Sequence, residues 1–245
     1  MPFAVHMGGG GSISLEDYLN KTAPSGQVSA PSITKLYGFT FADNAVMTDF
    51  SAASVTRIGE RDFWNCSELT NVTMPELEYA GMSSVADGSI THTTTCHAFQ
   101  ESHKLGNINL PKLQKAGAGL FYRCGYGQST YNAVIVLPAI TLLGQNAFTQ
   151  GKFKAVDLGP NLTKIYNDTF YGGTYDAVIL RSTTLVSANT RDAVRGITKL
   201  YVPSALVASY ATATNWSTDA GSRTVLAIEG SLYETHYADG TPIGG

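Results

Sequence analysis

A hydrophobic spacing that recurs along most of this 245-residue chain is the feature that most constrains its fold. An apolar residue is followed eight positions later by phenylalanine at Ile33 and Phe41, Val55 and Phe63, Leu113 and Phe121, Ile140 and Phe148, and Leu162 and Phe170. Leu77 reaches Phe99 only after an insertion of about fourteen residues, and Leu185 pairs with Val194 at a spacing one residue longer. The spacing predicts a repeat of about 22 residues with interruptions.

Each repeat begins with a short stretch in which apolar and polar residues alternate. The stretches are clearest at residues 71–74, 107–110, 134–137 and 199–202, and each is followed by a proline. Alternation with a period of two predicts a short strand with one buried face, and the proline marks its end. Aligning the other repeats in the same way adds strands at residues 28–30, 50–52, 156–158 and 178–180.

One repeat is too small to bury its own apolar side, whereas repeats stacked in parallel share a continuous core. We therefore expect a β-rich repeat solenoid, a leucine-rich repeat of about eight short parallel strands with small helical caps, spanning on the order of 35 Å. Residues 28–203 form the predicted solenoid, residues 1–27 an N-terminal tether or cap, and residues 204–245 a C-terminal cap.

Local signals refine this expectation. Gly59, Gly81, Gly117 and Gly144 lie at turns for which we expect a positive φ. Ser14 is placed to cap a short helix that presents Leu15, Tyr18 and Leu19. The C-terminal cap is predicted to contain a helix at residues 205–211, a strand at 224–228 and a hairpin at 238–240. Insertions at about 81–95 and 125–131 interrupt the repeat and are expected to emerge from the surface.

The combined pattern, approximately LTxVxLPxLTxIGxxAFxxC, resembles the BspA-like leucine-rich repeat family. The resemblance is clearest at residues 55–66, 140–148 and 162–170, and it covers about residues 28 to 203. That family includes bacterial surface adhesins and prophage-encoded proteins, so the resemblance implies a fold and not a single activity. Residues 201–207, Tyr-Val-Pro-Ser-Ala-Leu-Val, are similar to the ends of repeat proteins from phages and prophages of Gram-positive bacteria.

Composition excludes several kinds of partner. With 16 basic and 19 acidic side chains the net charge is -3, and no basic run is present to bind a nucleic acid backbone. No apolar stretch approaches the roughly 18 residues of a membrane span. Residues 1–11 lack the basic start and apolar core of a secretion signal, so we expect synthesis in a host cytoplasm without export.

The sequence offers no convincing catalytic, cofactor or metal site, and we expect none. It contains no phosphate-binding glycine motif and no nucleophile and base at workable spacing. The densest titratable cluster, His92, Cys96, His97 and His103, matches no zinc motif and is interpreted as a polar loop. Cys66, Cys96 and Cys124 are expected to be reduced, and Cys66 and Cys124 follow an anchor phenylalanine by three residues, where a small thiol packs well.

Two surfaces are candidates for binding a partner. The first is an edge on which stacked repeats would gather aromatic residues, in glycine- and serine-rich company that favours recognition. Its candidate receptor-binding residues are Trp64, Tyr122, Tyr126, Tyr131, Tyr171 and Tyr175. The alternative is that these rings cover the turns of their own repeats.

The second surface is the outward face of the strands. Its early positions are polar (Asn71, Thr73, Asn107 and Asn109), whereas its later positions are mostly apolar (Val134, Val136, Ala155, Ala177, Ile179 and Tyr201). An exposed apolar patch of this kind marks an interface. The alternative is that the tail of the chain, residues 223–245, folds across it.

These observations favour a non-enzymatic binding or adhesion protein over an enzyme. The first hypothesis is a phage or prophage virion protein that recognises a bacterial surface receptor, with a glycan as the candidate receptor. The second is a structural accessory subunit of a phage tail or capsid that docks other virion subunits. The third is an adhesin on a bacterial cell surface. The repeat pattern leaves homo-oligomerisation open.

Overall fold

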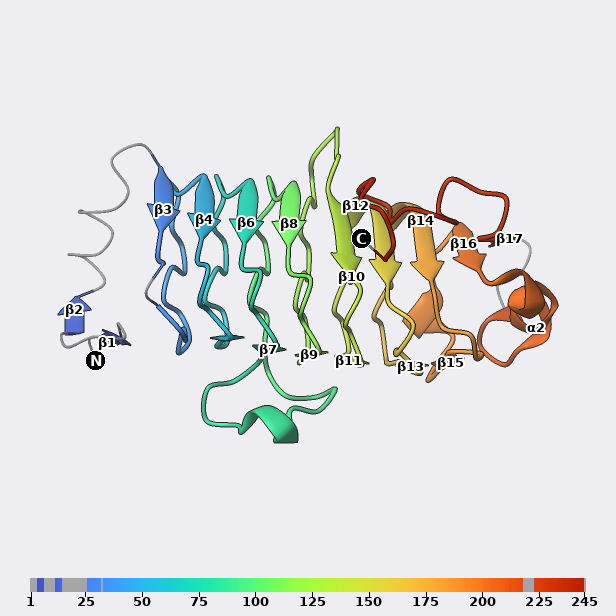
Figure 1. The fold of residues 1–245 in the computed structure, drawn as a ribbon, viewed down its shortest axis with the longest axis horizontal. Helices are drawn as coiled ribbons and strands as arrows, with labels where there is room; N and C mark the ends of the chain where they lie inside the picture. Colours follow the sequence, from blue (N-terminus) through green and yellow to red (C-terminus); the bar gives the residue numbers. More distant parts are fainter. Residues whose placement is uncertain (1–3, 7–11, 15–25, 32, 218–222, 245) are drawn as a thin grey trace.

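The structure is a computed structural model that describes residues 4–6, 12–14, 26–31, 33–217 and 223–244. Figure 1 shows a solenoid whose strands lie side by side along the long axis of the molecule. In the described part of the chain, nine strands form one parallel sheet. In sheet order they are β3 (Gln27–Ser29), β4 (Asp49–Ser51), β6 (Asn71–Thr73), β8 (Asn107–Asn109), β10 (Val134–Leu137), β12 (Lys152–Leu158), β14 (Thr174–Leu180), β16 (Lys199–Val202) and β17 (Thr224–Ala227).

The predicted solenoid is therefore confirmed, and the tail strand adds a ninth rung by pairing in parallel with β16. β12 and β14 begin earlier than predicted, because Phe153 and Tyr175 also turn into the core and their strands stay in register there. The described helices are short: 3-10 turns at Asp87–Ser89, Asp192–Val194 and Ser204–Leu206, and α2 (Val207–Thr212). No helix in the described ranges is long and apolar enough to cross a membrane.

Two-residue strands make a second side of the coil. β5 (Arg57–Ile58), β7 (Tyr79–Ala80), β9 (Lys115–Ala116) and β11 (Leu142–Leu143) form one parallel sheet, and β13 (Lys164–Ile165) pairs with β15 (Ser187–Ala188). The third side of each coil is the turn that carries the anchor phenylalanine. The anchor rings of successive coils stack in a column, with neighbouring centroids 5.1 to 5.5 Å apart. The column consists of Phe41, Phe63, Phe99, Phe121, Phe148 and Phe170.

The last repeat departs from the predicted spacing. Leu185 is 40% exposed, whereas its neighbour Val186 is fully buried and is the apolar residue that anchors this repeat in the core. Val186 precedes the buried Val194 by eight residues, so the regular spacing holds in this repeat after all. The amide of Val186 donates to the hydroxyl oxygen of Tyr210 on α2 at 3.0 Å, which ties the C-terminal helix to the end of the solenoid.

The expected positive φ at Gly59, Gly81, Gly117 and Gly144 is wrong, because none of these residues adopts one. At three of them, glycine is required by the close approach of neighbouring coils. A Cβ on Gly59 would lie 2.3 Å from the Gly38 nitrogen, one on Gly117 2.1 Å from the Thr94 oxygen, and one on Gly144 2.3 Å from the Gly117 carbonyl carbon. Positive φ occurs instead two residues before and two residues after the anchor phenylalanines, as at Asn146 and Gln150 around Phe148.

The N-terminal segment is described only as a two-stranded antiparallel pair, β1 (Ala4–His6) and β2 (Ser12–Ser14). Ser14 thus ends a strand, and the rest of the predicted helix, with Leu15, Tyr18 and Leu19, lies outside the described residues. Whether residues 1–27 cap or tether the solenoid stays a prediction. At the other end, the predicted hairpin is present, with Gly240 at a φ of +88° and a bridge between His236 and Pro242.

Candidate ligand-binding groove

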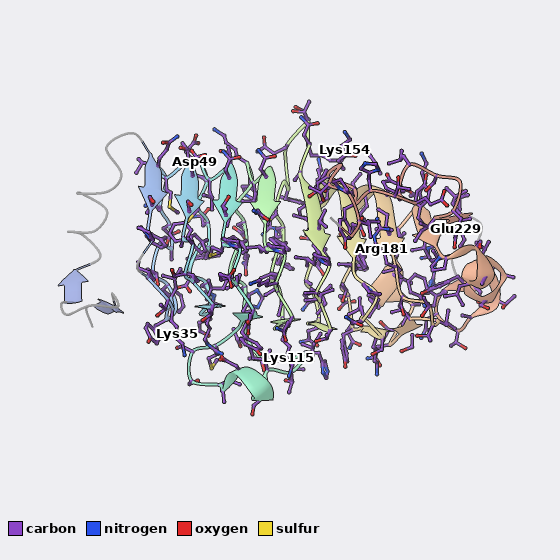
Figure 2. All side chains as sticks on the ribbon, viewed as in Figure 1. Lys35, Asp49, Lys115, Lys154, Arg181 and Glu229 are labelled. Carbon is purple, nitrogen blue, oxygen red and sulfur yellow. The ribbon has the colours of Figure 1, made fainter. Side chains whose placement is uncertain are left out.

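The outer face of the nine-stranded sheet changes from polar to apolar between β8 and β10. The register of the strands aligns the outward side chains in two rows across the sheet. One row is Gln27, Asp49, Asn71, Asn107, Val134, Ala155 and Ala177, and the other is Ser29, Ser51, Thr73, Asn109, Val136, Asp157, Ile179 and Tyr201. Figure 2 shows Asp49 on the polar half and Arg181 on the apolar half.

The C-terminal tail covers the apolar half. After β17 the chain turns back across β14 and β12, as the red segment in Figure 1 shows. Ala155, Ala177, Ile179 and Ile228 form a buried cluster, and Val134, Tyr201, Tyr233 and Ala238 pack against it. The hypothesis of an open interface is therefore wrong at Val136, Ala177 and Ile179, because the alternative of a covering tail removes this apolar surface from water. Val134 and Tyr201 are half-buried, and Val134 lines the hollow beside β8. Ile179 is fully buried and Val136 is 8% exposed.

One ion pair anchors the tail to the sheet. Arg181 Nε and Nη2 donate to Asp157 Oδ1 and Oδ2, each at 2.7 Å. The same guanidinium donates to the carbonyl oxygens of Tyr233 and His236, at 2.9 and 3.0 Å, and Asp157 Oδ2 also accepts the amide of Ala238 at 2.9 Å. Burial raises the pKa of Asp157, although the bonds from Arg181 oppose that shift.

The polar half carries a hydrogen-bonded ladder of side chains. Asn107 Nδ2 donates to Asn71 Oδ1 at 2.6 Å, and Asn71 Nδ2 donates to Asp49 Oδ1 at 2.5 Å. The ladder fixes the orientation of each amide, because an amide that donates to one neighbour cannot flip without losing the bond. At the end of the ladder, Asn107 is exposed, with a carbonyl oxygen and one N–H directed to solvent or to a ligand.

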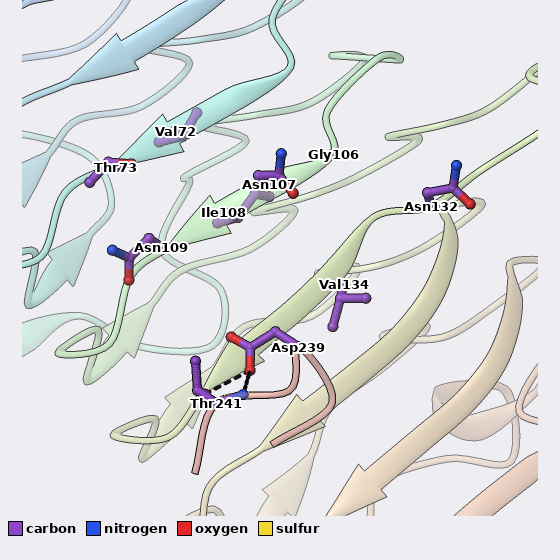
Figure 3. A pocket seen from close by; sticks show the side chains of 10 residues that line it. All are labelled: Val72, Thr73, Gly106, Asn107, Ile108, Asn109, Asn132, Val134, Asp239 and Thr241. Atoms are coloured by element: carbon purple, nitrogen blue, oxygen red, sulfur yellow. Dashed lines mark hydrogen bonds between the residues drawn. The ribbon is translucent and has the colours of Figure 1, made fainter. Parts of the chain in front are cut away.

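A groove runs along β8, where the polar half meets the tail. Its central hollow has a volume of about 360 Å³ and is drawn in Figure 3. We call the β8 groove the surface formed by Gly106, Asn107, Asn109, Asn132, Asp239 and Thr241. A hollow of about 310 Å³ continues it past Gly106 and Asn132, and one of about 160 Å³ continues it past Asn109 and Asp239. The three hollows follow β8 from its first residue to its last.

Two segments from outside the repeat build the wall of the groove. The tip of the tail hairpin contributes Asp239, whose Oδ1 accepts the amide and the hydroxyl of Thr241 at 2.9 and 2.7 Å. The insertion at 125–131 forms the wall at the start of β8, where the hydroxyl of Tyr131 donates to Asp176 at 3.0 Å. Sequence reasoning missed this groove because its wall depends on where the tail returns. The switch from polar to apolar outward residues after Asn109 was the signal available.

Only some of the predicted aromatic residues share an edge. Trp64, Tyr122 and Tyr171 each follow an anchor phenylalanine, and backbone hydrogen bonds between coils keep these positions in register, so their role in binding stays a prediction. Trp64 and Tyr122 are half-buried on their turns, and Tyr131 lies in the wall of the groove. Tyr126 and Tyr171 are 45% and 37% exposed, and each lies against the guanidinium of an arginine. Tyr175 is only 2% exposed, and its hydroxyl donates to the Phe148 carbonyl at 2.5 Å, so its candidacy as a binding residue is wrong. It faces the core because β14 extends back to Thr174.

The four residues of the predicted histidine and cysteine cluster contact different parts of the structure. His92 stacks on Tyr166 at 4.0 Å, His97 packs against Gly119, and His103 contacts the Arg123 carbonyl at 3.1 Å. Cys96 is fully buried. Within the described ranges, no three histidine, cysteine, aspartate or glutamate side chains converge as metal ligands would.

Cys66 and Cys124 serve the stacking of the coils. Their thiols donate to the carbonyl oxygens of Phe41 and Phe99, the anchors of the preceding coils, at 3.1 and 2.9 Å. Burial raises the pKa of Cys66 and Cys96 to about 12 and that of Cys124 further, so these thiols stay protonated at neutral pH. A protonated, buried thiol is a poor nucleophile.

The fold defines a leucine-rich repeat solenoid with an open polar groove on its parallel sheet. The chain belongs to the BspA type leucine-rich repeat family, whose model matches it in six copies over residues 25–97 and 89–187. A crystal structure of a leucine-rich cell surface protein from Faecalibacterium prausnitzii A2-165 is similar over 89% of this chain and 91% of that one, with 14% identity and a TM-score of 0.30. No curated protein matches the chain. These matches offer no support for a phage origin.

Proposed function

We propose that the protein is a non-enzymatic binding protein that holds its ligand in the β8 groove. The observation that carries this proposal is the contrast between the halves of the sheet. The apolar half is covered by the tail of the chain, whereas the polar half ends in an open groove lined by Asn107, Asn109 and Asp239. A concave surface with convergent polar groups is the ordinary form of a binding site.

The chemistry of the groove fits a neutral glycan. Its amides and hydroxyls both donate and accept hydrogen bonds, and its one carboxylate accepts them, as sugar hydroxyl groups require. Among the described residues no lysine or arginine lines the central hollow, so a strongly anionic ligand would find no counter-charge there. At the upper end of the groove Lys104 is paired with Glu68 at 2.8 Å, and Lys152 donates to the Gln128 carbonyl at 2.7 Å.

The proposed setting for this binding is a bacterial surface, with the protein acting as a cell-surface adhesin. Membership of a family that includes such adhesins supports this setting. A virion protein that recognises a bacterial receptor is the second candidate, and the resemblance of residues 201–207 to the ends of phage repeat proteins favours it. The third candidate is a structural virion subunit docked through its N-terminal segment and its apolar strand face, and the tail covers the second of these surfaces.

Retention of labelled protein on immobilised bacterial cell-wall polysaccharides, neutral and anionic, tests the groove. We expect saturable retention on a neutral polysaccharide and a loss of about tenfold or more in the double variant Asn107→Ala/Asp239→Ala, because two hydrogen bonds of about 1 kcal/mol each are removed. The matched control is Tyr126→Ala/Tyr171→Ala, which alters exposed aromatic residues outside the groove. If the control variant loses retention and the groove variant keeps it, the proposal that the ligand binds in the β8 groove is overturned, and the aromatic residues become the favoured binding site.

The setting is tested separately. An antibody raised against the protein should label intact bacteria that produce it, and the surface fraction of those cells should contain it. Recovery of the protein in purified phage particles, with no label on intact cells, would contradict the adhesin proposal and support the virion candidate.

A further inference from the structure

The wall of the β8 groove is held in place from a distance. In the described part of the chain, the hydrogen bonds that join residues 233–244 to the sheet all run to Arg181 or Asp157. Within this segment, the hairpin from His236 to Pro242 carries Asp239 and Thr241 at its tip. Its other hydrogen bonds join residues of the tail to one another. The hydrogen bonds that attach the hairpin wall to the sheet therefore all run to one ion pair that does not line the groove.

The geometry of this pair suits an anchor. Arg181 binds Asp157 through two parallel hydrogen bonds, and the two side chains are 10% and 0% exposed. Bidentate pairs of this kind fix direction as well as distance. The Cζ atom of Arg181 lies 4.9 Å from the centroid of the Tyr237 ring, so the guanidinium also contacts the hairpin through a cation–π interaction. All three guanidinium nitrogens of Arg181 donate hydrogen bonds, either to Asp157 or to the tail.

The rest of the attachment is a small apolar contact. Ile228, Tyr233 and Ala238 pack on Ala155, Ala177 and Ile179, in a cluster separate from the main core of the solenoid. Such a contact favours a covered sheet but sets no exact position, because the hydrophobic effect is not directional. The ion pair supplies the direction that the apolar contact lacks.

We propose that Arg181 is a positioning residue for the β8 groove, which through Asp157 fixes the C-terminal hairpin as a wall and confines the ligand to β8. This inference rests on the proposed function. With the hairpin in place, the groove ends at Asp239 and Thr241. With the hairpin displaced, the groove opens onto the apolar surface of β12 and β14, and a ligand matched to polar groups loses one side of its site.

The experiment compares Arg181→Gln, Arg181→Lys and the double variant Arg181→Gln/Asp157→Asn in the full chain. The double variant removes both charges, so that no carboxylate is left buried alone. Three readouts are measured: retention on immobilised neutral cell-wall polysaccharide, hydrogen–deuterium exchange of residues 229–244, and fluorescence of an apolar dye that binds exposed hydrophobic surface. Far-UV circular dichroism confirms that each variant is folded. The control is Arg195→Gln, whose ion pair with Asp192 lies outside the groove.

We expect Arg181→Gln and the double variant to exchange residues 229–244 at least tenfold faster, to bind more dye and to lose about tenfold in retention. Arg181→Lys should restore part of the retention, and adding Asp239→Ala to Arg181→Gln should cause little further loss, since both act through the same wall. Unchanged exchange, or faster exchange with unchanged retention, would overturn the inference. Absence of retention in the wild-type protein would overturn the proposed function instead, and exchange and dye binding would still decide whether Arg181 holds the hairpin.

Discussion

At the scale of single residues, the solenoid depends on backbone positions that accept few side chains. Gly144 and Gly172 illustrate two different reasons why a side chain is not accepted. Gly144 has an ordinary φ, but a Cβ would lie 2.3 Å from the backbone of Gly117 in the preceding coil, whereas Gly172 has a φ of +63° and its Cβ would meet only a side chain at 3.5 Å. Contact between coils and left-handed backbone are thus distinct constraints on this repeat.

These two glycines give the first prediction. Gly172→Ala should destabilise the protein by about 1 kcal/mol, the cost of a left-handed conformation for a residue with a Cβ. Gly144→Ala should destabilise it by more, because two coils must move apart. Urea denaturation followed by circular dichroism measures both free energies of unfolding. Equal losses would contradict the assignment of Gly144 to a close contact between coils.

The buried thiols give a prediction about pH. Folding raises the pKa of Cys66 and Cys96 to about 12, whereas an unfolded thiol ionises at about pH 8.5. A raised pKa means that the contribution to stability is complete below the unfolded value and is lost as the pH rises toward the folded one. The free energy of unfolding should therefore fall between about pH 9 and pH 11, by about 1.4 kcal/mol per pH unit for each thiol.

Denaturation of the wild-type protein and of Cys66→Ala/Cys96→Ala over this pH range measures the effect. The slope of stability against pH, and not its level, is the quantity to compare, since the substitutions also remove packing. Buried Tyr175 and Tyr210, whose pKa values are also raised, contribute to the slope in both proteins. Identical slopes would show that the thiols are not buried as described.

At the scale of the repeated element, the column of phenylalanine rings connects successive coils through the core. Phe121 lies between Phe99 and Phe148, at 5.3 and 5.5 Å, and is fully buried. Phe121→Ala should destabilise the protein by about 3–5 kcal/mol, through lost burial and the cavity left behind. Phe121→Leu should cost less. Thermal denaturation checks the order, and a loss below about 1 kcal/mol for Phe121→Ala would contradict a close-packed column.

The elements that the sequence predicted correctly are those with a local cause. Strand positions follow from alternation, and the anchors follow from the spacing of eight residues. The role of Gly117 could not be predicted, because it depends on how closely Thr94 of another coil approaches. The β8 groove was missed for the same reason, since the tail hairpin comes from residues far along the chain. Val186, in contrast, precedes Val194 by the regular eight residues, so the sequence alone pointed to this anchor in place of Leu185.

At the scale of the whole molecule, the sheet is divided into an open polar half and a covered apolar half. The apolar surface should become exposed in a variant that ends at residue 228, because Ala155, Ala177 and Ile179 lose their cover. We expect this variant to self-associate or to bind an apolar dye more strongly than the full chain at the same concentration. Light scattering measures the mass of both proteins, and an unchanged mass together with unchanged dye binding would contradict the covering role of the tail.

The central claim, that the ligand lies along β8 against the tail hairpin, is tested most directly by hydrogen–deuterium exchange with and without a retained neutral cell-wall polysaccharide. The predicted result is slower exchange at residues 106–109, 131–134 and 237–241, with no change at Tyr126 and Tyr171. Slower exchange around those two tyrosines, with residues 106–109 unchanged, would contradict the account and move the binding site to the exposed aromatic residues.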